Sequence, residues 1–162
     1  MLPRSLLHPR IDARVYPSFL RGAYDTAVFE ALREVEISVR EAAGFGPEKY
    51  GRFHKKSRGG LKKLLQAAKN AGLLRDAGFP SLKRRRENAA MIEQEIATVL
   101  GQTPESLAEE PYVDRVIAGL PEIRNKFAHP DMHTIIPAGM AVDSLIVAAE
   151  IINQLWPAPS QG

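Results

Sequence analysis

The hydrophobic residues recur every three to four positions in several long stretches, which is the spacing of one face of an α-helix. The clearest stretch is 24–43, and its apolar positions are Tyr24, Ala27, Val28, Ala31, Leu32, Val35, Val39 and Ala42. Further helices are predicted over residues 61–71, 80–100, 112–128 and 138–155. No stretch alternates apolar and polar residues as a half-buried strand does. The pattern therefore predicts an all-α fold.

Both ends of the chain add detail to this prediction. Residues 9–21 are expected to form a short first helix or an irregular lead-in, because Pro17 interrupts them. The stretch 138–155 carries a second apolar set, Met140, Val147 and Ile151, in addition to its main stripe. A helix that is apolar nearly all round has to be covered on both sides. Together with Phe29 and Ile37, which lie opposite the stripe of their own helix, this second set predicts a homodimer.

Length and composition suit one soluble domain, residues 1–157, followed by a short C-terminal tail, residues 158–162. Cysteine is absent, which excludes disulfides, thiolate nucleophiles and cysteine-bound zinc. Residues 1–10 contain no continuous apolar core of a secretory signal, and no uninterrupted apolar run is long enough to cross a bilayer. We therefore expect a cytoplasmic protein that does not engage a membrane.

The charges are strongly segregated along the chain. Residues 49–86 contain thirteen Lys or Arg and one acid, Asp76, a net charge of +12, whereas the other residues carry −9. A solvated lysine-rich face is one interpretation. The other is a surface that attracts polyanions. For that surface we predict RNA contacts from ten residues: Lys55, Lys56, Arg58, Lys62, Lys63, Lys83, Arg84, Arg85, Arg86 and Lys126.

The sequence Arg-Asn-Lys-Phe-Ala-His, residues 124–129, ends an apolar-periodic stretch and is followed by Pro130. Arg124 falls on the apolar face of the predicted helix, where a charge needs an anionic partner or an open site. A guanidinium can hold two phosphate oxygens, and an imidazole can exchange a proton near neutral pH. Because Pro130 disfavours helical conformation at His129, the histidine is expected to turn back toward Arg124.

These six residues resemble the Arg-x4–6-His motif of the HEPN superfamily, all-helical proteins that include metal-independent RNA endonucleases. The segment Arg-Gly-Ala-Tyr-x-x-Ala-Val-x-x-Ala-x-x-x-Val-Glu, residues 21–36, looks like the first long helix of many members. With the segment Leu-His-Pro-Arg-Ile, residues 7–11, it is most similar to an abortive-infection group of that superfamily. The basic stretch 44–86 matches no pattern of the family.

The resemblance implies an antiparallel four-helix-bundle core with additional short helices and a basic insert. It also implies a dimer whose two motifs face one cleft, and RNA cleavage that leaves a 2′,3′-cyclic phosphate. Arg124, Asn125 and His129 would be the catalytic residues. The chain would act as a toxin or phage-defence effector, with an antitoxin or another defence protein as a possible partner. Some members of the superfamily are thought to be inactive binding or scaffold domains.

Other interpretations of the same residues remain open. His129 and His133, with Asp131 between them, could contribute to a metal site, although Pro130 breaks the helix that would align them. The basic stretch could make the chain a nucleic-acid-binding or scaffold module without catalysis. Arg124 and His129 could also have only a structural role at the helix end. No phosphate-binding glycine loop is present, so we expect no cofactor. We also expect no metal, because no fixed third ligand accompanies these residues.

Overall fold

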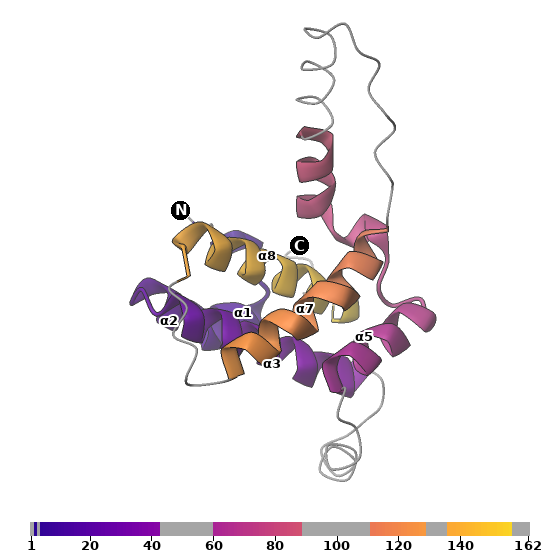
Figure 1. Cartoon of the computed structure of the whole chain (residues 1–162), viewed down its shortest axis with the longest axis horizontal. Coiled ribbons are helices and arrows are strands. Elements are labelled where there is room, and N and C mark those ends of the chain that lie inside the picture. Colours follow the sequence, from indigo (N-terminus) through magenta and orange to yellow (C-terminus); the bar gives the residue numbers. More distant parts are fainter. Residues whose placement is uncertain (1, 3, 43–59, 89–110, 129–135, 157–162) are drawn as a thin grey trace, which may run out of the picture.

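The computed structural model describes residues 2, 4–42, 60–88, 111–128 and 136–156, and every regular element in these ranges is helical (Figure 1). The elements are η1 (Arg4–Leu6), α1 (Pro9–Arg14), α2 (Tyr16–Leu20), α3 (Tyr24–Ala42), α5 (Gly60–Asn70), η2 (Asp76–Gly78), α7 (Tyr112–Ala128) and α8 (Ala138–Leu155). Residues 80–88 are helical as well. The all-α class is therefore confirmed, whereas the antiparallel four-helix core stays a prediction.

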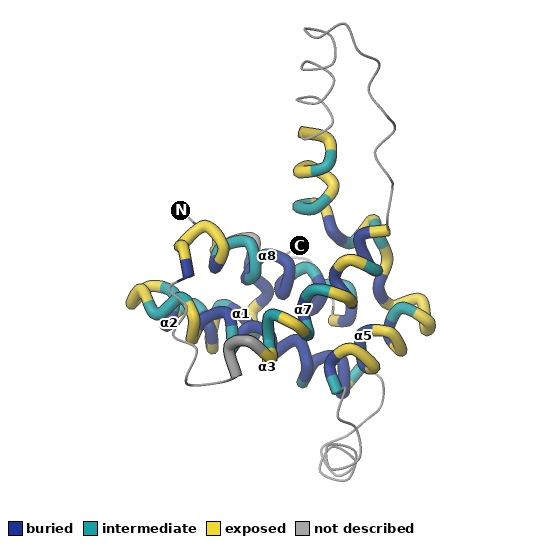
Figure 2. The backbone as a smooth tube through the Cα atoms, in the orientation of Figure 1, coloured by how far each residue is buried: buried dark blue, intermediate teal, exposed yellow. Residues whose placement is uncertain are grey.

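Helix α3 is the centre of the core. It packs against α8 most extensively, and it also contacts α7, α5, α2 and α1. Its predicted apolar stripe is buried at Ala27, Val28, Ala31, Leu32, Val35 and Val39. Figure 2 shows the buried residues running along the surfaces where α3 meets its neighbours. The helical period read from the sequence therefore identifies the face of α3 that forms the core.

Helix α8 is covered within a single chain, which changes one of the arguments for a dimer. Val147 and Ile151, the second apolar set predicted to need a partner, are buried against the rest of the same chain. Only Met140 of that set is exposed. Phe29 and Ile37 are half-buried. These residues therefore do not require a second subunit, and the homodimer stays a prediction that rests on the resemblance.

By length and apolar composition alone, α8 would suffice to cross a membrane, and it is the one such helix among the described residues. Core helices of soluble proteins meet the same criteria. Eight of its residues are buried against the other helices: Ala141, Leu145, Val147, Ala148, Ala149, Ile151, Ile152 and Leu155. The packing of α8 against α3 and α1 accounts for its apolar character.

The predicted lead-in before α3 consists of two short helices rather than one. His8 caps α1 by accepting a hydrogen bond from the backbone N–H of Arg10 at its Nδ1, 3.2 Å away. The chain turns at Val15, and Pro17 lies in the first turn of α2, where its missing N–H costs little. The other ring nitrogen of His8 lies 2.9 Å from the carbonyl oxygen of Trp156. This contact ties the start of the chain to the end of α8.

The helical residues 80–88 stand away from the body in Figure 1, and their base is fixed to α8. The backbone N–H of Ser81 donates to Glu150 at 3.3 Å, and Arg85 forms an ion pair with Asp143. The predicted remainder of this helix, to residue 100, lies outside the described residues. The basic run at 83–86 is therefore attached to α8 from one side.

Candidate functional site around Arg124

Helix α7 places Arg124 at the junction of three helices. Its buried residues Val113, Val116, Ile117 and Leu120 form the predicted apolar face. The helix continues through Pro121 to Ala128, so Arg124 keeps its helical position beyond the proline. Its Nη2 lies 2.8 Å from Oε2 of Glu36 on α3. The side chain of Arg124 is 29% exposed and that of Glu36 only 3%, so the ion pair joins a half-buried cation to a buried anion.

The same carboxylate contacts a second guanidinium. Nη2 of Arg40, one turn further along α3, donates to Oε1 of Glu36 at 2.9 Å, and the side chain of Arg40 is 1% exposed. Helix α5 begins against this pair, because a Cβ at Gly60 would lie 3.1 Å from Nη2 of Arg40. Only a residue without a side chain lets the start of α5 approach Arg40 this closely without a shift. Glu36 therefore lies between Arg40 and Arg124, beside the first residue of α5.

This arrangement makes Arg124 a fixed and accessible positive charge. Two guanidiniums share the one carboxylate of Glu36. Burying a charge is costly unless it is paired, and Glu36 supplies that pairing. A guanidinium carries five N–H donors, of which the contact of Arg124 with Glu36 uses only part. The group can therefore bind an external anion while Glu36 holds it.

Of the other predicted catalytic residues, Asn125 is exposed on α7 next to Arg124. His129 lies outside the described residues, so its approach to Arg124 stays a prediction. The segment of the rival metal site, residues 129–133, is also outside the described ranges. Within the described ranges, no three His, Asp or Glu side chains gather as metal ligands would.

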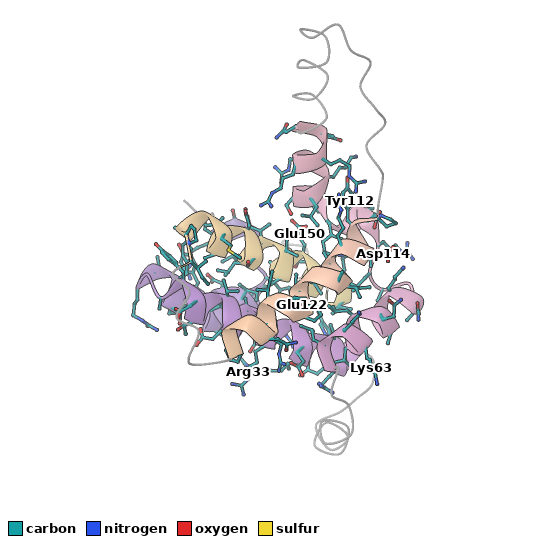
Figure 3. All side chains as sticks on the ribbon, viewed as in Figure 1. Arg33, Lys63, Tyr112, Asp114, Glu122 and Glu150 are labelled. Atoms are coloured by element: carbon teal, nitrogen blue, oxygen red, sulfur yellow. The ribbon has the colours of Figure 1, made fainter. Side chains whose placement is uncertain are left out.

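The predicted RNA-binding residues fall on two separate surfaces. Lys62 and Lys63 are exposed in the first turn of α5, and Figure 3 shows Lys63 at the same edge of the molecule as Arg33 of α3. The basic run at 83–86 lies on the helix that stands away from the body, well separated from Lys63 in the same view. We call Arg33, Lys62, Lys63 and Arg124, which lie on the mutually packed helices α3, α5 and α7, the α5 edge. The predicted polyanion site therefore divides into two.

The side chains of the basic run, residues 83–86, differ in the contacts that they make with other residues. Lys83 lies 4.0 Å from Glu87, Arg85 is paired with Asp143, and Arg86 stacks over Tyr112 with its Cζ 4.1 Å from the ring centroid. Arg84 is exposed and has no ion pair with any described residue. The side chain of Lys126 lies outside the described residues, as do Lys55, Lys56 and Arg58.

The sequence did not predict the role of Glu36 and Arg40. Their spacing of four residues is a signal for a helical ion pair. Both also border the apolar stripe of α3, next to Val35 and Val39, so burial of the pair was open to inference. Nothing in the sequence pointed to a contact between Glu36 and Arg124, because these residues belong to helices far apart in the chain.

No protein-family model, curated protein or solved structure matches this chain. The resemblance to the HEPN superfamily therefore stays a prediction carried by the two motifs quoted above. An assignment of function has to come from the residues and their geometry.

Proposed function

We propose that this protein is a metal-independent RNA endonuclease that acts as a dimer, with Arg124 and His129 as its central catalytic residues. One observation carries the proposal. The guanidinium of Arg124 is held by a buried carboxylate at 2.8 Å, yet its side chain remains 29% exposed. A partly exposed cation whose donors are not all used by Glu36 suits a phosphodiester, because preorganised donors stabilise negative charge as it develops.

The chemistry assigns a task to each residue. Cleavage needs a base that takes the proton of the 2′-hydroxyl and an acid that protonates the leaving 5′-oxygen. A positioned imidazole contributes about 10²–10⁴-fold to such steps. One His129 cannot readily fill both roles, whereas two copies in a dimer can. Arg124 would stabilise the phosphorane, and Asn125 would orient the phosphate or the histidine. The products would be a 2′,3′-cyclic phosphate and a free 5′-hydroxyl.

The α5 edge supports RNA as the substrate. Arg33, Lys62 and Lys63 are exposed cations that have no ion pair with any described residue. Together with Arg124 they provide positive charge from three helices, α3, α5 and α7, that pack against one another. Such a field attracts the nucleic-acid backbone without regard to base sequence.

The test measures RNA cleavage in EDTA together with the melting temperature of each variant. We expect the wild type to cut RNA, and we expect Arg124→Ala and His129→Ala each to abolish cleavage while the protein stays folded. Arg115→Ala, an exposed arginine on the same helix, and His133→Ala serve as matched controls that keep activity. Folded Arg124→Ala or His129→Ala variants that still cut RNA would refute the assignment of these two residues as catalytic.

A second candidate is RNA binding without cleavage, as a binding or scaffold module of a defence complex. The observation in its favour is that Glu36 already gives Arg124 an anionic partner inside the fold. That contact explains an arginine on an apolar face without any substrate. A wild type that binds RNA with a steep salt dependence, but never cuts it in the dimeric state, would favour this candidate.

A further inference from the structure

We propose that Glu36 is a positioning residue for Arg124, and that Arg40 and the start of α5 fix Glu36 in turn. This inference rests on the proposed function, and it adds a specific role for three residues that do not contact the substrate. These residues form a series of contacts that leads from the start of α5 to Arg124. Gly60 at the start of α5 adjoins Arg40, Arg40 binds one oxygen of Glu36, and the other oxygen binds Arg124.

The two oxygens of Glu36 are used differently. Oε1 receives Nη2 of Arg40 at 2.9 Å, and this contact is buried on both sides. Oε2 receives Nη2 of Arg124 at 2.8 Å, and the side chain of Arg124 is 29% exposed. A carboxylate held at one oxygen cannot rotate freely, so the direction of the other oxygen is fixed as well. Arg40 therefore fixes the position of Oε2 of Glu36, and Oε2 in turn orients the guanidinium of Arg124.

Helix α5 takes part because it is attached at both ends. Its first residue, Gly60, leaves room for Arg40, and near its other end Lys69 forms an ion pair of 2.5 Å with Asp114 of α7. The same helix carries Lys62 and Lys63 on its exposed face. RNA bound at those lysines would rest on the helix that adjoins the Arg40–Glu36 pair. Lys62 and Lys63 are thereby connected to Arg124 through the contacts of α5 with α3 and α7.

The first test compares Glu36→Gln with Glu34→Gln. Glu34 is a matched control, because it is equally buried on the same helix and is paired at 3.0 Å with Arg14, which has no contact with Arg124. We expect Glu36→Gln to lower kcat for RNA cleavage in EDTA by about 10²-fold, the effect of a misplacement of roughly 1 Å. KM should stay within about twofold. Glu34→Gln should lower the melting temperature but leave kcat unchanged. Equal kcat values for the two folded variants would overturn the proposal.

A second measurement keeps this inference separate from the proposed function. Side-chain NMR of arginine reports whether a guanidinium rotates freely, with the Arg124 signal assigned from Arg124→Lys. We expect a resolved, slowly rotating Arg124 signal in the wild type and in Glu34→Gln, and its averaging in Glu36→Gln. A wild type that cuts no RNA would refute the proposed nuclease, and the NMR comparison would still decide the positioning role. An Arg124 signal that is unchanged in Glu36→Gln would overturn that role.

Discussion

Replacing Glu36 by leucine tests how far the fold depends on the buried ion pair at its centre. Glu36 and Arg40 are 3% and 1% exposed, and their side chains meet at 2.9 Å. Glu36→Leu removes the carboxylate that two guanidiniums share, the buried one of Arg40 and the half-buried one of Arg124. Breaking a buried pair in this way costs about 3–5 kcal/mol. A typical domain has about 5–15 kcal/mol of unfolding free energy, so this single change should remove about a fifth or more of it.

This loss of unfolding free energy predicts a measurable shift of the melting temperature. For a chain of 162 residues, each kcal/mol moves the melting temperature by about 2–4 °C, so Glu36→Leu should lower it by roughly 6–20 °C. Urea unfolding followed by far-ultraviolet circular dichroism gives the free energy directly, because the described elements are helical. Glu41→Leu is the matched control. Glu41 is on the same helix, but its pair with Arg10 is 40% and 33% exposed, so its loss should cost less than about 1 kcal/mol.

The double variant Glu36→Leu/Arg40→Met separates charge from packing. If the cost of the single change comes from the charge left behind, replacing both members by apolar groups of similar volume should restore stability to within about 1–2 kcal/mol of the wild type. A Glu36→Leu variant no less stable than Glu41→Leu would refute the reasoning about the pair. A double variant as unstable as the single one would place the cost in packing or in the charge of Arg124, which both variants leave without Glu36.

Two further predictions concern the basic run and its anchor on α8. Replacing Lys83, Arg84, Arg85 and Arg86 by serine should weaken RNA binding across sequences and flatten its salt dependence, measured by fluorescence anisotropy at several salt concentrations; an unchanged affinity and slope would put the site elsewhere. Burial raises the pKa of Glu150 above the ordinary value of 4.5. The folded state therefore binds this proton more tightly than the unfolded chain does, and wild-type stability should fall relative to Glu150→Gln as pH rises from 4.5 through the folded-state pKa. Urea unfolding across that range gives the difference, and parallel pH profiles would contradict it.

The helix bounds were readable from the sequence where local signals agree with the apolar period. The predicted helices 112–128 and 138–155 have the bounds of α7 and α8. Each is preceded by a proline, Pro111 or Pro137, that marks the start, and each carries its apolar residues at helical spacing. Starts and stops of helices depend on a few neighbouring residues. For this reason they can be predicted without knowledge of the tertiary structure.

The segment that packs on each face of a helix could not be predicted from the sequence in the same way. The second apolar set of α8 correctly indicated burial on two sides, but Val147 and Ile151 are covered by their own chain and not by a partner. The basic stretch 49–86 is continuous in the sequence, yet its described part occupies two surfaces because α5 and residues 80–88 diverge. Periodicity and charge describe one helix at a time. The partner of a face depends on contacts between distant segments, on which a single sequence carries no information.

Arg124 shows where this limit affects the assignment of function. An arginine on an apolar face predicts an anion, and that anion can be a substrate phosphate or an internal carboxylate. Glu36 supplies the internal one, but it engages Arg124 at a single oxygen, the other being bound to Arg40. Glu36 is buried, and it is shared between the buried Arg40 and the half-buried Arg124. The donors of Arg124 that Glu36 does not use can bind a phosphate. The contact between Glu36 and Arg124 is compatible both with a positioned phosphate-binding arginine and with a purely structural one, and Glu36→Gln with its Glu34→Gln control distinguishes the two.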